Sequence, residues 1–330
     1  MSLLFFLAAA AAPQPSELKT FGDWTVGCDN GLACHATSLH PENSEWEGRG
    51  AIAVTREPEP DAQPSISLFT NEEKAALRVD GRPLRVRLAT NESGVAVAAA
   101  DVPAALAALR TSRELDVRAA EGGGRVSLRG LSAALLYMDD RQKRIGTVTA
   151  LVKRGPRLAS AVPAPPPLPE VVELKSLGTR KAALPAKRLA ELRASGDCND
   201  DAPREVTSVA LDARTTLTLV PCWLGPYNST SLVLVAQRED GSDLRPARFD
   251  FNASAGEVTG ADVPPGGAYW DEEAGRLSSY FKGRGLGDCG SMQEWAWDGT
   301  MFRLIRAQTM GECRGSTDYI TTWRAKAVRR

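Results

Sequence analysis

The sequence predicts a mainly β protein made of two β-rich domains and stabilised by disulfides. Short runs of alternating apolar and polar residues recur between Gly, Pro and Asn, which is the pattern of strands joined by turns. Six cysteines make an even number, as expected of a disulfide-bonded exported protein. A proline-rich run divides the 330 residues near their middle, so we expect about two domains.

The chain begins with a stretch that predicts a secretory signal peptide over residues 1–15. MSLLFFLAAAAAPQP places an apolar run before small residues, as signal peptides do, although no Lys or Arg precedes Leu3. No cysteine follows the run to accept a lipid. No later segment approaches the roughly 20 apolar residues of a spanning helix. We therefore expect an exported chain without a transmembrane segment, located in the periplasm or secreted.

Residues 18–157 are expected to form a sandwich-like β domain with one or two short helices. Strands are expected on both sides of the turn at Asp29-Asn30-Gly31 and over residues 51–56, 65–69, 76–79, 84–88, 95–99, 115–119 and 125–128. One helix is expected over residues 103–110, because Pro103 suits a first helical turn. A second is expected over residues 131–145, where Leu131, Leu135 and Met138 follow helical spacing. Both helices are expected to cap the sheet.

A Pro-rich linker is expected over residues 158–183. Its centre, AVPAPPPLP at residues 161–169, lacks most backbone donors and favours an extended polyproline conformation, which suits a semi-rigid spacer. The alternative, a peptide ligand for an aromatic groove, is the less favoured interpretation of a bare Pro tract.

Residues 184–330 are expected to form a second β domain, arranged as an antiparallel meander after a short amphipathic helix at residues 184–194. Its strands are expected over residues 205–212, 215–221, 231–237, 244–251, 275–282, 294–297 and 301–308. Asp298-Gly299 is the strongest short hairpin signal, because a two-residue turn favours these residue types. Trp295 should then pair roughly with Phe302, at the centre of this domain.

The cysteines predict three disulfides. Cys28 and Cys34 bracket a turn-rich loop that is short enough to close with disulfide geometry. The four later cysteines allow three connectivities. We favour Cys198 with Cys222 and Cys289 with Cys313, because each pair closes a short local segment.

Composition and motifs exclude several functional classes. A net charge of −1, from 40 basic and 41 acidic residues, provides no global field for nucleic acid. Histidine occurs only at His35 and His40, and CDNGLACH has five residues between its cysteines where a haem attachment needs two. The acidic run at Asp197 lacks the glycine and glutamate of a calcium-binding EF-hand. With no hydrolase elbow, phosphate loop or zinc motif, the sequence predicts no catalytic residues, metal or cofactor.

One Gly-rich loop is the candidate ligand site. Gly285 to Gly290, GLGDCG, matches a dinucleotide motif formally, but a Trp-rich strand follows where that motif needs a helix. The loop is better interpreted as a tight turn that brings together Lys282, Arg284 and Asp288. Either an anionic ligand or a local salt bridge explains this cluster, and the salt bridge is favoured.

Several motifs resemble the bacterial envelope family catalogued as domain of unknown function 1176. They are Asp23-Trp24, Cys28-Asp29-Asn30, Cys34-His35-Ala36, Cys222-Trp223, Gly225-Pro226-Tyr227-Asn228, the run from Lys282 to Gly290, and Trp295-Ala296-Trp297-Asp298-Gly299. The first half is more distantly similar to invasion-associated locus B proteins, in its Asp-Trp and cysteine pattern and in residues 126–131. The resemblance implies an exported β domain and supplies no catalytic residues.

Three functions are compatible with the sequence. The preferred one is an exported cell-envelope binding or interaction module, with an unidentified envelope protein or glycan as its partner. The alternative is an envelope hydrolase that uses carboxylates near the loop from Gly283 to Gly290. A purely structural or stress-protective factor is the third.

Overall fold

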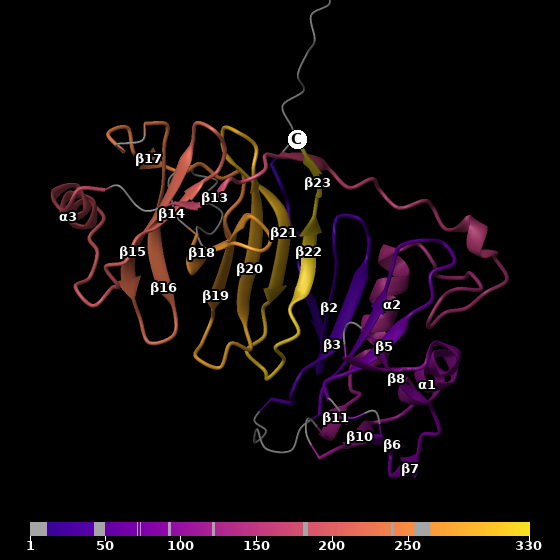
Figure 1. Ribbon diagram of the computed structural model, residues 1–330. Coiled ribbons are helices and arrows are strands. Elements are labelled where there is room, and N and C mark those ends of the chain that lie inside the picture. Colours follow the sequence, from indigo (N-terminus) through magenta and orange to yellow (C-terminus); the bar gives the residue numbers. More distant parts are fainter. Residues whose placement is uncertain are drawn as a thin grey trace, which may run out of the picture.

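The computed structural model describes residues 12–42, 50–70, 72, 74–91, 94–120, 123–180, 184–238, 241–253 and 265–330. Within these ranges the protein is mainly β, as predicted, and has two large hydrophobic cores. The two halves that contain them lie side by side (Figure 1). The predicted signal peptide falls mainly on residues 1–11, which lie outside the described residues. No helix in the described ranges is long and apolar enough to cross a membrane.

The first half contains two antiparallel sheets. The seven-stranded sheet has the spatial order β1 (Lys19–Phe21), β2 (Trp24–Cys28), β3 (Cys34–Ser38), β4 (Ile52–Arg56), β5 (Ser65–Leu68), β9 (Gly94–Val97) and β8 (Leu88–Asn91). The four-stranded sheet has the order β11 (Gly124–Ser127), β10 (Glu114–Arg118), β6 (Ala76–Val79) and β7 (Arg82–Pro83). Both sheets contribute to one core, which agrees with the sandwich-like prediction.

Strand β2 is buried on both faces. Trp24, Val26 and Cys28 alternate into the first core, as the sequence predicts. The opposite face lies against strand β22 (Ile320–Arg324) of the second half. Gly27 permits this approach, since a Cβ at Gly27 would lie only 3.1 Å from Ile320. The two halves therefore meet along β2, the strand next to the edge strand β1 of the first sheet.

Two helices close the first core. Helix α1 (Val102–Leu109) has proline in its first turn and buries Leu106 and Leu109. Helix α2 (Leu131–Arg141) buries Leu131, Leu135 and Met138. The predicted end of α2 at Ile145 is wrong, because the chain adopts a left-handed conformation at Lys143 (φ 57°).

One predicted strand of the first half is also wrong. The segment 84–88 does not form a continuous strand; β7 ends before it and β8 begins at Leu88. The side chain of Asp101 accepts a hydrogen bond from the backbone N–H of Arg87 (2.8 Å). The Arg87 N–H therefore does not form a backbone hydrogen bond to a neighbouring strand. Local side-chain bonding here replaces the strand that alternation predicts.

The second half is a sandwich of two antiparallel meanders. One sheet has the order β13 (Gly178–Arg180), β14 (Thr207–Ala210), β15 (Thr216–Leu224), β16 (Ser229–Ala236) and β17 (Arg245–Pro246). The other has the order β18 (Ala268–Asp271), β19 (Arg276–Lys282), β20 (Gly290–Trp297), β21 (Phe302–Met310) and β22. Both sheets bury their apolar residues in the second core. The predicted meander is present, but it is folded onto itself as two layers.

The Asp298-Gly299 hairpin forms with a different register from the predicted one. Strands β20 and β21 pair Trp297 with Phe302, while Trp295 lies opposite Leu304. The backbone N–H of Asp298 bonds the carbonyl of Met301 (3.1 Å), so four residues separate the strands. The Asp298 carboxylate also accepts the N–H of Met301 (2.8 Å), which stabilises the longer loop. Both tryptophans still lie in the core, because residues two apart share one face of a strand.

Two further expectations about the second half need correction. The strand expected over residues 244–251 is reduced to the two residues of β17, because the chain then leaves this sheet and Phe249 forms a parallel bridge with Phe302 of the other sheet. The sequence pattern also missed strand β12 (Glu170–Glu173), which pairs in parallel with β23 (Lys326–Arg329). This pairing ties the end of the Pro-rich segment to the end of the chain.

The Pro-rich segment crosses between the halves along one end of the molecule (Figure 1). It follows the short 3-10 helix η2 (Ala159–Ala161) and leads to β12. The predicted helix after it is present as α3 (Ala186–Ser195). A domain boundary at residues 158–183 stays a prediction, although the two cores draw on residues from either side of it.

The three predicted disulfides are all present. Cys28 bonds Cys34, Cys198 bonds Cys222, and Cys289 bonds Cys313. None of the six cysteines is free. The first disulfide closes the β2–β3 turn, and the third joins the start of β20 to the loop after β21.

Candidate functional site

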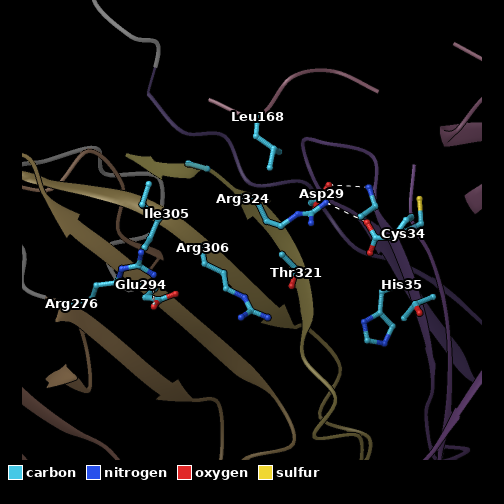
Figure 2. Close-up of a pocket in the computed structure, with 15 residues that line it drawn as sticks. Asp29, Cys34, His35, Leu168, Arg276, Glu294, Ile305, Arg306, Thr321 and Arg324 are labelled. Atoms are coloured by element: carbon cyan, nitrogen blue, oxygen red, sulfur yellow. Dashed lines mark hydrogen bonds and ion pairs between the residues drawn. The ribbon is translucent and has the colours of Figure 1, made fainter. Parts of the chain in front are cut away.

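One candidate site is a cavity of about 540 Å³ between the two halves. Strands β3 and β4 and the β2–β3 turn form one wall, while β20, β21 and β22 contribute the other. Figure 2 shows His35 and Arg306 on opposite walls and Leu168 of the Pro-rich segment at the rim. Its lining residues are Asp29, Ala33, Cys34, His35, Thr55, Glu57, Leu168, Arg276, Glu294, Ile305, Arg306, Thr321, Arg324, Ala325 and Ala327.

The cavity walls are held together by polar contacts. Arg324 forms an ion pair with the buried carboxylate of Asp29. Its backbone N–H donates to the side chain of Asn30 (2.7 Å), which returns a bond to the Arg324 carbonyl (2.9 Å). These contacts join the first disulfide loop to strand β22, so they hold the two halves together at the cavity.

A second set of ion pairs also joins the two halves. Arg314, in the loop after β21, forms an ion pair with Asp23 (2.5 Å), which also pairs with Arg129 (3.0 Å). Burial opposes ionisation of Asp23, but hydrogen bonds from Arg129, Ser127 and Arg314 outweigh it and lower the pKa of this carboxyl. A small apolar cluster of Leu39 with residues of the second half lies nearby.

His35 contributes a titratable group to the cavity wall. Its Nε2 lies 2.6 Å from a carboxylate oxygen of Asp318, which belongs to the loop before β22. A catalytic triad would need a hydroxyl or thiol nucleophile bonded to the other ring nitrogen. Among the described residues no such group is hydrogen-bonded to His35. The pair is therefore a polar contact between the two halves in the cavity wall.

Two of the three cavity arginines are neutralised by neighbours. Arg276 pairs with Glu173 (2.6 Å) and with Glu294 (3.3 Å). The hydrogen bond to Glu173 raises the pKa of Arg276 despite its partial burial. Arg324 is committed to Asp29, as described above. These two arginines therefore serve mainly to organise the walls.

Arg306 differs from both. Its side chain is exposed, and no carboxylate of the described residues lies within ion-pair distance of its guanidinium. A free guanidinium offers a planar fork of N–H donors that matches a carboxylate or phosphate. Arg306 is thus the arginine of the cavity whose charge is best placed to pair with an anionic ligand.

A second hollow of about 260 Å³ continues the cavity across the outer face of strands β18 to β21. Glu294 and Arg306 line both hollows, so the two form one continuous surface. Tyr269 and Tyr280 line the far part, together with Asp271, Met292, two serines and two glutamines. A long polar surface with aromatic side chains suits an extended ligand better than a compact one. We refer to the two hollows together as the interdomain cleft; the first lies between the halves, and the second lies on the second half alone.

The structure brings together two of the three predicted site residues. Arg284 and Asp288 form a bidentate ion pair (2.7 and 2.5 Å), and Asp288 also accepts the N–H of Gly315 (2.7 Å). Burial opposes ionisation of Asp288, but Arg284 and Gly315 lower its pKa overall. With only 2% of its side chain exposed, this carboxylate is poorly suited to act as a general acid.

Lys282 lies apart from that pair. Its ammonium is 5.5 Å from the ring centre of Tyr280, and its backbone groups bond the side chain of Asn228. A ligand-binding role for Lys282, Arg284 and Asp288 together stays a prediction.

Sequence reasoning missed most of the cleft. It considered His35 only as one of two histidines, and it did not single out Arg306, Arg324 or Asp318. They lie far from His35 in the sequence, and Asp318, which contacts His35, is 283 positions away. No local motif marks such a site. Within the described ranges no group of three or more His, Cys, Asp or Glu side chains is placed to hold a metal ion.

The fold and the cleft define a class: a two-core, disulfide-bonded β protein with a polar cleft. The chain belongs to the family described as protein of unknown function DUF1176, whose model matches residues 18–326. It is 30% identical over 351 residues to the Escherichia coli (strain K12) protein titled "Uncharacterized protein YpfG", covering 97% of each chain.

A solved structure, invasion associated protein B from Bartonella henselae, is also weakly similar. The identity is 22% and the TM-score 0.28, over 39% of this chain and 99% of that chain. A TM-score this low carries no argument about fold or function.

Proposed function

We propose that this protein is an exported cell-envelope binding module whose interdomain cleft holds an extended, anionic partner, either a glycan or a segment of an envelope protein. Export is supported by the signal-peptide pattern and by the three disulfides, which persist in oxidising compartments. The periplasm is the compartment that fits both features.

The exposed Arg306 guanidinium is the observation that carries the proposal. It lines both hollows of the cleft, and two carboxylates of the cleft, Glu294 and Asp29, are paired with Arg276 and Arg324. A charge-assisted hydrogen bond of this kind contributes about 1.5–3 kcal/mol when it is made in a partly buried site. An anionic ligand would therefore gain a large part of its affinity at this residue.

The test begins with direct titration. We expect soluble cell-wall glycopeptide fragments, which carry both sugars and carboxylates, to bind the purified protein, while a neutral oligosaccharide of equal length binds more weakly. Arg306→Gln should weaken binding by about tenfold or more. Arg188→Gln is the matched control, because Arg188 lies on α3 and outside the cleft-lining set. Equal binding by the two variants would contradict the proposal.

In-cell photo-crosslinking tests the same site without a chosen ligand. A photoreactive residue at Thr321, on the cleft wall, should capture an envelope component, and the same residue at the exposed Leu158 should not. The capture should disappear when Arg306→Gln is added. Capture that persists in the Arg306→Gln background would show that the cleft charge plays no part.

A further inference from the structure

Two loops lie side by side at one end of the second half: the turn between β15 and β16 and the loop between β19 and β20. The side chain of Asn228 locks them together, because it donates to the Lys282 carbonyl (2.8 Å) and accepts the Lys282 N–H (2.9 Å). The first loop is closed by the bond from the Gly225 N–H to the Asn228 carbonyl (2.8 Å). Together the loops form one rigid unit outside the interdomain cleft.

This unit carries a cluster of exposed apolar side chains. Trp223, Leu224, Tyr227 and Leu286 have relative exposures of 45%, 46%, 44% and 63%. They are four of the nine large apolar side chains that are exposed in the described part of the chain. Trp223 and Leu224 end strand β15, while Tyr227 and Leu286 lie in the two loops. Single exposed apolar residues are ordinary, whereas several at one end of a molecule mark an interaction surface. We call these four residues the apolar edge.

Glycines support the two rings of the apolar edge. A Cβ at Gly225 would lie 2.2 Å from the Trp223 indole, so the ring covers this glycine closely. A Cβ at Gly285 would lie 3.7 Å from the ring of Tyr227, which places that ring against the second loop. The rings therefore rest on the loop backbones and keep their other sides in solvent. Ordering them on binding costs little conformational entropy.

The charges around the apolar edge are mixed. Lys282 has no carboxylate partner among the described residues, whereas the charge of Arg284 is neutralised by Asp288. On the other side, the Asn199 side chain bonds the backbone of Leu224, and the exposed Asp200 follows it. One free cation beside an acidic flank predicts binding that depends mainly on apolar contact and only slightly on ligand charge.

These features favour a lipid surface over the other partners. A stable protein interface buries about 800 Å² on each side, while four half-exposed side chains supply about 400 Å². A sugar ring would stack on Trp223 or Tyr227, but the most exposed residue, Leu286, offers a sugar no hydrogen bond. Trp and Tyr prefer the bilayer interface, and aliphatic side chains insert below it.

We propose that the apolar edge is a membrane-contact surface. Trp223, Leu224, Tyr227 and Leu286 enter the headgroup region of a bilayer, and Lys282 lies at the level of the lipid phosphates. The surface lies outside the interdomain cleft, so its function does not depend on the cleft binding any ligand.

Vesicle flotation tests this proposal. The chain should start at Ser16, which retains every described helix and strand and removes the apolar residues 1–11 that would themselves bind lipid. We expect it to float with phosphatidylcholine vesicles. The double variant Trp223→Ala, Leu286→Ser should bind at least about tenfold more weakly, given the apolar area removed. Lys282→Gln should lower binding by about fivefold on vesicles that contain phosphatidylglycerol and leave phosphatidylcholine binding unchanged.

The matched control is the double variant Leu158→Ser, Leu177→Ser, which removes two side chains of 68% and 60% exposure elsewhere. It should float like the wild type, and all variants should keep the wild-type melting temperature. Absence of flotation by the wild type, or an equal loss in the control, would overturn the proposal. If the wild type does not bind vesicles, and the first double variant loses binding to a cell-wall glycan or to a protein partner, the apolar edge is instead the binding surface for that glycan or protein.

Discussion

The Gly-rich loop and the interdomain cleft both gather arginines and carboxylates, but they use them differently. In the loop, Arg284 and Asp288 satisfy one another, and the Arg284 guanidinium also bonds the Cys313 carbonyl (2.8 Å). In the cleft, Arg306 has no such partner among the described residues. Clustered charges near one another in sequence are therefore a good sign of a structural ion pair. A ligand site is better recognised by a charge that its neighbours leave unmatched.

The largest expected effect is the loss of stability when the loop pair is broken. Asp288→Asn should lower the free energy of unfolding by about 2 kcal/mol, because it removes the charge of a buried carboxylate that pairs with the partly exposed Arg284 and accepts the Gly315 N–H. Urea unfolding followed by fluorescence measures this change. Asp140→Asn is the control, since the exposed pair of Asp140 with Lys143 (3.8 Å) should contribute less than about 1 kcal/mol. An unchanged midpoint for Asp288→Asn would mean that the loop carboxylate is free for a ligand.

Acid should weaken the same pair. The pKa of Asp288 in the folded protein lies below its ordinary value of 3.8, so the unfolded chain takes up a proton first as the pH falls. The stabilisation is fully present above about pH 4 and is lost as the pH drops through the folded pKa. Asp288→Asn should therefore show a shallower loss of stability between about pH 4 and pH 2 in urea titrations. A slope equal to that of the wild type would argue against an ionised Asp288.

The smallest expected effect on stability is at Arg306. Because this side chain is exposed and unmatched, Arg306→Gln should change the free energy of unfolding by less than about 0.5 kcal/mol. The same variant should lose ligand binding, so the two measurements separate a binding residue from a structural one. A large loss of stability would show that Arg306 supports the fold, and the contrast with the loop would disappear.

Much of the fold could be predicted because its signals are local. Alternation at Trp24 and Val26, helical spacing at Leu131 and Leu135, and short cysteine separations all report the nearest neighbours in the chain. The errors arise where a distant or side-chain contact decides the outcome. Asp101 bonds the backbone of Arg87 and replaces a strand, and the parallel pairing of β12 with β23 joins segments 156 residues apart.

The sequence by itself determined the class of fold, the three disulfide pairs as its favoured connectivity, and the expectation of export. These depend on periodicity, turn chemistry and short spacings, which the chain carries locally. Only the tertiary structure decided that Asp288 is committed to Arg284, that Arg306 is left free, and that Trp223 and Leu286 share one exposed edge. Each of these facts depends on which distant side chains become neighbours, and that is set by the packing of the two cores.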